Sequence, residues 1–129
     1  MPRTDDEIQA AVSKLQARDQ AQRQAILAYG INLAKERQMD LSFWAPNRAD
    51  ADLLREALER NGMTAVKVLA PVPAKSDDSR WLITAGMVAS VDFMTTLDNV
   101  ATFVLFADKY NCEYDGWGTA IVEAANPPQ

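Results

Sequence analysis

The chain has 129 residues, of which 48% are hydrophobic and 24% charged, and this composition is typical of one globular domain rather than of a disordered or fibrous protein. The formal net charge of −5 argues against direct binding of nucleic acid, because such binding needs a basic surface. No apolar run reaches the roughly 18 residues of a membrane span. The first residues lack the apolar core of a secretory signal, and one cysteine cannot form a disulfide within the chain, so we expect a cytoplasmic protein without membrane contact.

A leading helix is predicted over residues 4–29. Thr4 and Glu7 have the spacing of a capping box, and Gly30 is suited to end the helix. Three apolar residues near its start share one helical face, but residues 16–24 are almost wholly polar. We therefore expect this helix to contact the rest of the domain only at its two ends.

The body of the domain is predicted over residues 39–123. Alternating apolar residues indicate strands over 39–45, 63–70 and 80–89, and the first two flank a helix that starts after Asn47. A second helix starts at Ser90 and is the most hydrophobic of the chain; its predicted buried stripe is Phe93, Leu97, Val100, Val104 and Ala107. If that stripe is the core, Leu97→Ala costs about 2–5 kcal/mol.

The order of elements is one helix followed by β-α-β-β-α-β, which predicts an α+β fold of the ferredoxin-like, split β-α-β type. In that fold a four-stranded antiparallel sheet carries two helices on one face. The prediction is a single domain over residues 1–129, with the helix at 4–29, the body at 39–123 and a loose tail at 124–129.

Residues that carry enzyme chemistry are scarce. The chain has no histidine, and a lone cysteine, Cys112, is best interpreted as a small buried hydrophobic residue. Glu113 and Asp115, two apart on a predicted strand, could hold a hard cation or act in acid–base catalysis, but a solvated strand edge is the simpler interpretation. We expect no enzyme activity, no cofactor and no metal.

Two glycines flank a tryptophan in the predicted last strand. A glycine inside a strand commonly marks a bulge, so we expect Gly116 to allow a bulge and Gly118 to leave room beside the ring of Trp117. On one interpretation the bulge presents Trp117 and Tyr114 beside Glu113 and Asp115 as a protein-binding surface. The alternative interpretation places Trp117 in the core beneath the leading helix.

Residues 106–119 read FADKYNCEYDGWGT, which resembles the C-terminal signature of the RraB family, regulators of ribonuclease activity. The resemblance is specific over this stretch, because a tryptophan between two glycines is rare in a strand. From about residue 39 to this stretch, only the order of elements agrees. The resemblance implies a small acidic protein with a ferredoxin-like fold that binds ribonuclease E and inhibits RNA cleavage without binding RNA itself.

Members of the family bind the arginine-rich scaffold half of that nuclease, and an acidic protein suits such a partner. The alternatives are an interaction domain of the same fold with another protein partner, or a small-molecule or metal-binding enzyme that uses Glu113 and Asp115. The sequence does not indicate an oligomeric state.

Overall fold

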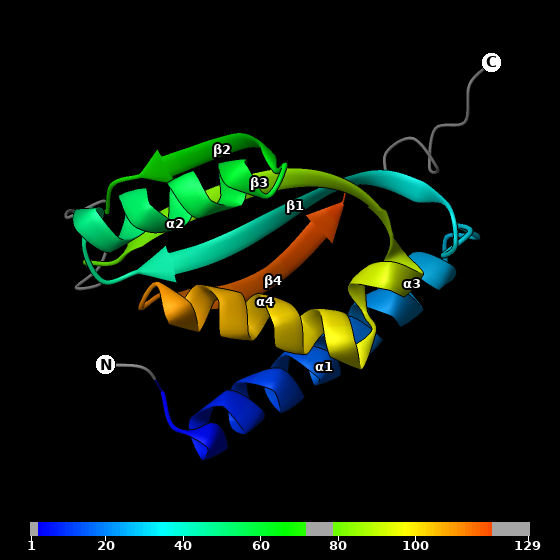
Figure 1. Ribbon diagram of the computed structural model, residues 1–129. Helices are drawn as coiled ribbons and strands as arrows, with labels where there is room; N and C mark the ends of the chain where they lie inside the picture. The colour runs from blue at the N-terminus through cyan, green and yellow to red at the C-terminus, as the bar shows by residue number, and fades with distance from the viewer. Residues whose placement is uncertain (1–2, 72–78, 120–129) are drawn as a thin grey trace.

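A computed structural model describes residues 3–71 and 79–119 of the chain (Figure 1). The elements are helix α1 (Asp5–Leu27), strand β1 (Glu36–Ala45), helix α2 (Arg48–Arg60), strands β2 (Thr64–Leu69) and β3 (Trp81–Ser90), helices α3 (Val91–Met94) and α4 (Leu97–Lys109), and strand β4 (Glu113–Thr119). The predicted tail and the end of the predicted last strand, beyond residue 119, lie outside the described residues.

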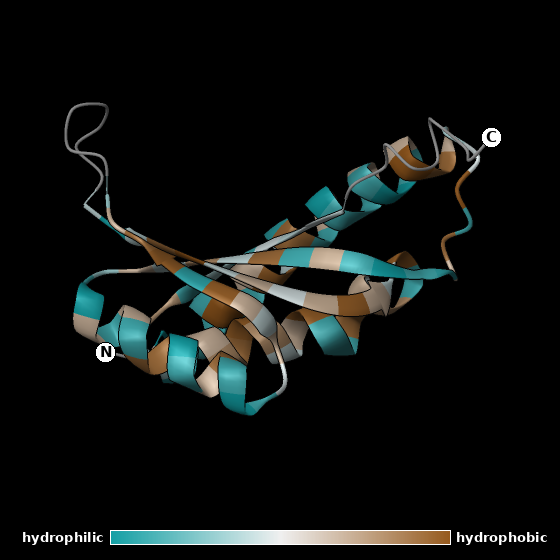
Figure 2. Ribbon diagram, turned by 90° about the horizontal axis from the view of Figure 1, so that it is seen from above, coloured by the Kyte–Doolittle hydropathy of each residue, from teal (hydrophilic) through white to brown (hydrophobic). Residues whose placement is uncertain are grey.

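The four strands form one antiparallel sheet in the order β2-β3-β1-β4. Helices α2 and α4 lie on the same side of this sheet (Figure 2). This arrangement confirms the predicted ferredoxin-like α+β fold, because each of the two β-α-β units encloses a strand of the other. Among the described residues, no helix combines the length and the apolar character that a membrane span needs.

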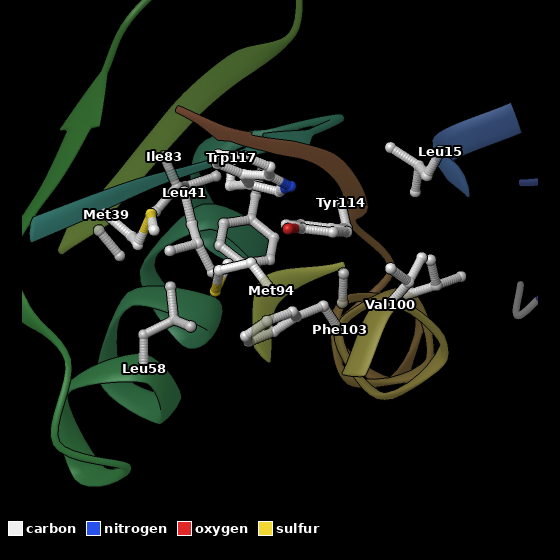
Figure 3. Packing of buried hydrophobic residues seen from close by; sticks show 14 of the residues in the cluster. Leu15, Met39, Leu41, Leu58, Ile83, Met94, Val100, Phe103, Tyr114 and Trp117 are labelled. Atoms are coloured by element: carbon white, nitrogen blue, oxygen red, sulfur yellow. The ribbon is translucent and has the colours of Figure 1, made fainter. Parts of the chain in front are cut away.

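The core lies between the sheet and its helices. Strand β1 runs through the middle of the sheet, and every second residue from Met39 to Ala45 is fully buried. Leu54 and Leu58 of α2 and Phe103 of α4 complete the core from the helical side. Figure 3 shows Leu58 and Phe103 in this position. The alternation predicted for β1 is therefore confirmed, since one face of this strand is covered and the other is not.

The predicted long helix after residue 90 is two helices. Ser90 caps α3 by accepting a hydrogen bond from the Phe93 amide at 3.0 Å, as its position predicts. The helix then ends at Thr95, and the hydroxyl of Thr96 caps α4. Both threonines also donate their hydroxyls to carbonyls of α3. Such side-chain bonds compete with helical backbone bonds, which explains a break that apolar periodicity alone does not reveal.

The break between α3 and α4 changes which residues of α4 are buried. Phe93 and Leu97 belonged to the predicted stripe, but both are about half exposed, and so is Leu105. The residues of α4 that are buried are Val100, Phe103, Val104 and Ala107. The core assignment of Leu97 is therefore wrong, and truncating a side chain that is 56% exposed leaves no cavity comparable to that of a buried leucine.

Helix α1 begins as predicted. The Thr4 hydroxyl accepts from the Glu7 amide at 3.2 Å, and the Thr4 amide donates to the Glu7 carboxylate at 2.9 Å, which completes the capping box. These hydrogen bonds lower the pKa of Glu7. The helix then passes below α4 and β4 in the view of Figure 1.

Candidate protein-binding surface

Strand β4 contains the predicted bulge. Ser42 of β1 is paired with Gly116 and Phe43 is paired with Tyr114, so Asp115 is an extra residue with no partner of its own. Gly116 has a φ of +103°, a conformation that residues with a side chain rarely adopt. Without the extra residue, Tyr114 and Trp117 would point to opposite faces of the sheet. With it, both lie on the face that the helices cover.

The side chains of Trp117 and Tyr114 belong to the core. Trp117 is 6% exposed and is paired with Leu41, and the Tyr114 ring lies 5.3 Å from that of Phe43 and 5.1 Å from that of Phe103 (Figure 3). The interpretation that the bulge presents these two aromatic rings on the surface is therefore wrong. Their large apolar area is more stable in the core, which is the alternative that the sequence left open.

A buried carboxylate connects Trp117 to the polar middle of α1. The indole Nε1–H donates to Asp19 Oδ1 at 2.9 Å, and Asp19 is only 3% exposed. One turn further along, Gln22 Nε2 donates to the Trp117 carbonyl at 3.1 Å. The prediction that α1 touches the body only at its ends is thus wrong. Hydrogen bonds hold its middle, which Figure 2 colours as hydrophilic.

The spacing along α1 could have revealed that Asp19 and Gln22 face the body of the domain, although not which residues they contact. Val12 and Leu15 are buried, and Ile26 is buried eleven residues after Leu15. Asp19 and Gln22 stand at the positions that continue this stripe in steps of three and four. A polar residue on the buried face of a helix needs a partner, and a tryptophan N–H is one of the few donors that a core can supply.

The surroundings of Asp19 disfavour its charge. Burial raises the pKa of Asp19, and the hydrogen bond from Trp117 and the nearby Arg18 only partly oppose this effect. Within the described part of the chain, Asp19 Oδ2 and the Tyr114 hydroxyl are buried without a hydrogen-bond partner. Burial also raises the pKa of Tyr114, and the negative charge of Asp19 adds to that rise. Helix α1 therefore contacts strand β4 through a carboxylate whose ionised form is disfavoured by burial.

Glu113 is exposed and Asp115 is about half exposed, and arginines from other elements form ion pairs with both. Glu113 lies 3.5 Å from Arg80 and 3.9 Å from Arg3, while Asp115 lies 3.4 Å from Arg18. A hollow of about 240 Å³ beside them is lined by both carboxylates and by these three arginines. Both carboxylates are therefore engaged in ion pairs within the described residues. In the described part of the chain, no group of three or more acidic or cysteine side chains could hold a metal ion.

Cys112 is buried, as its sequence position predicts. Its Sγ lies 3.3 Å from the Tyr110 carbonyl oxygen, and burial together with the charge of Asp50 raises its pKa to about 12. The side chain is therefore a thiol at neutral pH. Because the thiolate is the nucleophilic form, this cysteine offers no nucleophile.

The two glycines beside Trp117 have different structural requirements. A Cβ at position 116 would lie 3.1 Å from Arg18 Nη2 in a left-handed backbone, so Gly116→Ala is expected to cost about 1–3 kcal/mol. A Cβ at position 118 would meet no atom within 4 Å outside the neighbouring residues. Gly118→Ala should therefore change the free energy of unfolding by no more than about 0.5 kcal/mol. Urea denaturation of both variants measures the difference, and equal costs would contradict it.

The RraB family model, described as regulator of ribonuclease activity B, matches residues 7–119 of the chain. The match begins in the first turn of α1 and ends with β4, so it includes every element of the described fold. It also extends well beyond the stretch around Trp117 that carries the resemblance in the sequence. A search of curated proteins found no match.

Proposed function

Because the chain belongs to the RraB family of regulators of ribonuclease activity, we propose that it is a protein-binding regulator that inhibits ribonuclease E by direct contact in the cytoplasm and so slows RNA degradation. The match of the family model over residues 7–119 carries this proposal. An inhibitor of this kind needs a rigid surface and a complementary partner, and it needs no reactive group of its own.

The chemistry of the described residues supports a binding role. Cys112 is a protonated, buried thiol, and arginines hold the carboxylates of Glu113 and Asp115. The net charge of −5 opposes binding to RNA phosphates and favours a basic protein segment. A regulator with this charge therefore binds the nuclease rather than the RNA that the nuclease cleaves.

The exposed residues of the signature are the proposed rim of the contact. Tyr114 and Trp117 anchor the bulge from the core, and the bulge holds Asp115 outside the sheet beside Arg18. Glu113 and Asp115 would then contribute through exposed charge, which mainly affects the rate of association. Their charges can attract a basic segment even while their own arginine partners remain in place.

Titration of the purified protein into an RNA cleavage assay with ribonuclease E tests the proposal. We expect cleavage to fall as the protein is added, and we expect calorimetry to detect binding to the nuclease without RNA present. The double variant Glu113→Gln/Asp115→Asn should associate more slowly, with a smaller dependence on salt. Absence of binding to either half of the nuclease would contradict the proposal, and so would inhibition that depends on a complex between this protein and RNA.

A further inference from the structure

The face of the sheet opposite α2 and α4 carries a distinct row of side chains. Residues of β1 alternate, so the chain positions between the buried ones point to this open face. They are Glu36, Gln38, Asp40, Ser42 and Trp44. Asp40 is exposed in the middle of the row, and Trp44 is half-buried at its end. The central strand thus presents two carboxylates and one large aromatic ring on one side.

The sheet beside Asp40 is open on the side of β4. Asp40 is paired with Gly86 on β3 and with Gly118 on β4, and neither neighbour has a side chain. The space that a Cβ of Gly118 would occupy is empty to 4 Å apart from the adjacent residues of the chain. At Gly86, by contrast, a Cβ would lie 2.6 Å from Gln38 Nε2 and 3.2 Å from the Thr64 carbonyl oxygen, so this position is already covered. A backbone can therefore approach the sheet closely at Gly118, as glycines in strands often permit.

Apolar side chains border this part of the sheet. Trp44 is paired with Leu82, and Leu82 is paired with Leu69, so these three residues form a continuous row across β1, β3 and β2. Leu69 is 48% exposed. On the other side of Asp40, Val88 is 61% exposed and is paired with Gln38. Exposed apolar groups beside a polar centre are typical of a surface that binds a protein.

The charges on this face favour a cationic partner. Glu36 and Asp40 form no ion pair within the described residues, in contrast to Glu113 and Asp115. The ring of Trp44 already accommodates a guanidinium, since Arg80 Cζ lies 4.6 Å from its centroid. Lys67 is also on this face, but it lies on the outer strand β2. It is paired with Thr84, in the row next to the one that contains Asp40.

We propose that a basic, extended segment of a protein partner docks across this open face. Its arginine or lysine side chains meet Asp40 and Glu36, its backbone lies over Gly118, and its apolar side chains pack on the row of Trp44, Leu82 and Leu69. The identity of that partner as ribonuclease E rests on the proposed function, whereas the docking face rests on the charges, the open position at Gly118 and the apolar residues described above.

A lysine at position 118 is the sharpest test of this proposal. Gly118 has free space and no left-handed φ, so Gly118→Lys should fold normally while it places a long cationic side chain next to Asp40. The probe is a synthetic arginine-rich peptide, titrated into the isotope-labelled protein and followed by amide chemical shifts. We expect wild-type shifts to concentrate at Asp40, Ser42 and Gly118, and the affinity of Gly118→Lys to be at least about tenfold lower.

Matched control variants separate the effect of a substitution at the docking face from the effect of a change in net charge. Ala17→Lys adds the same charge on the exposed side of α1 and should bind the peptide within about twofold of wild type, since distant exposed charges are screened. Asp40→Asn should weaken binding by about two- to fivefold, whereas Asp98→Asn, at an exposed residue of α4, should not. Loss of binding in all four variants would show a diffuse charge effect and overturn the proposal.

Other outcomes would also overturn it. Amide shifts confined to the helical face would do so, and so would the absence of any peptide binding. A wild-type dimer that Gly118→Lys dissociates would also overturn it, because a second copy of the chain would then occupy the face. The nuclease assay reports separately on the proposed function. If Gly118→Lys inhibits RNA cleavage as well as wild type does, the docking face is wrong and the function stands. If wild type fails to inhibit while the peptide maps to this face, the function is wrong and the docking face stands.

Discussion

Replacing Trp117 with alanine is expected to lower the free energy of unfolding by about 3–5 kcal/mol, the cost of a large cavity at a buried aromatic residue. The substitution removes the ring that packs above Leu41, and it leaves the carboxylate of Asp19 without its only hydrogen bond in the described structure. Urea denaturation followed by circular dichroism measures this loss. Because the ring is buried, the affinity of the folded fraction for a partner should stay close to that of wild type.

Trp44→Ala is the matched control for this prediction. Trp44 is half-buried on the open face of the sheet, so its truncation should cost no more than about 2 kcal/mol. It should, however, weaken binding of the arginine-rich peptide, since Trp44 borders the proposed docking face. The reverse pattern, with stability lost at Trp44 and affinity lost at Trp117, would contradict both the core position of Trp117 and the docking face.

The fold was predictable because its signals are local and repeated. The alternation of Met39, Leu41 and Phe43 marks β1 as a strand with one covered face, and the caps at Thr4, Asn47 and Ser90 lie where the sequence predicts them. Hydrophobic periodicity and cap chemistry depend on neighbours within one or two turns. The order of such elements then leaves few topologies to choose from.

Long-range contacts explain the predictions that failed. Nothing near Asp19 in the sequence indicates Trp117, which lies 98 positions later, and polar residues on a helix are usually solvated. The bulge at Gly116 was predictable from its glycine, but the face that Trp117 occupies follows from the register of β4 on β1. A one-residue difference in register moves a side chain to the opposite face of a sheet.

The same limit applies to the candidate surface. Glu113 and Asp115 were predicted to be exposed beside each other, and their arginine partners come from the start of the chain, from α1 and from the residue before β3. Asp40 carries no motif that distinguishes it from any polar residue of an alternating strand. Its position between Gly86 and Gly118 exists only once three strands are paired.

Asp19 should make the stability of the domain depend on pH. Its folded-state pKa is raised by burial, so the unfolded chain releases this proton first as the pH rises. The contribution of Asp19 to the free energy of unfolding is therefore greatest below the ordinary pKa of aspartate. It falls as the pH rises toward the folded-state value and is constant above it. The hydrogen bond from the Trp117 indole and the charge of Arg18 both oppose this rise in pKa without cancelling it.

Two substitutions at position 19 isolate this effect. Asp19→Asn keeps an oxygen that can accept from the Trp117 indole and has no charge to bury, so its stability relative to wild type should increase as the pH rises from about 4 to 8. Asp19→Ala removes the acceptor and should cost about 1–3 kcal/mol, because the buried indole N–H then has no partner. Urea denaturation across this range compares both with wild type. Parallel curves for wild type and Asp19→Asn would show that Asp19 has the same pKa in the folded and unfolded states, and α1 would then be held by packing and the Trp117 hydrogen bond alone.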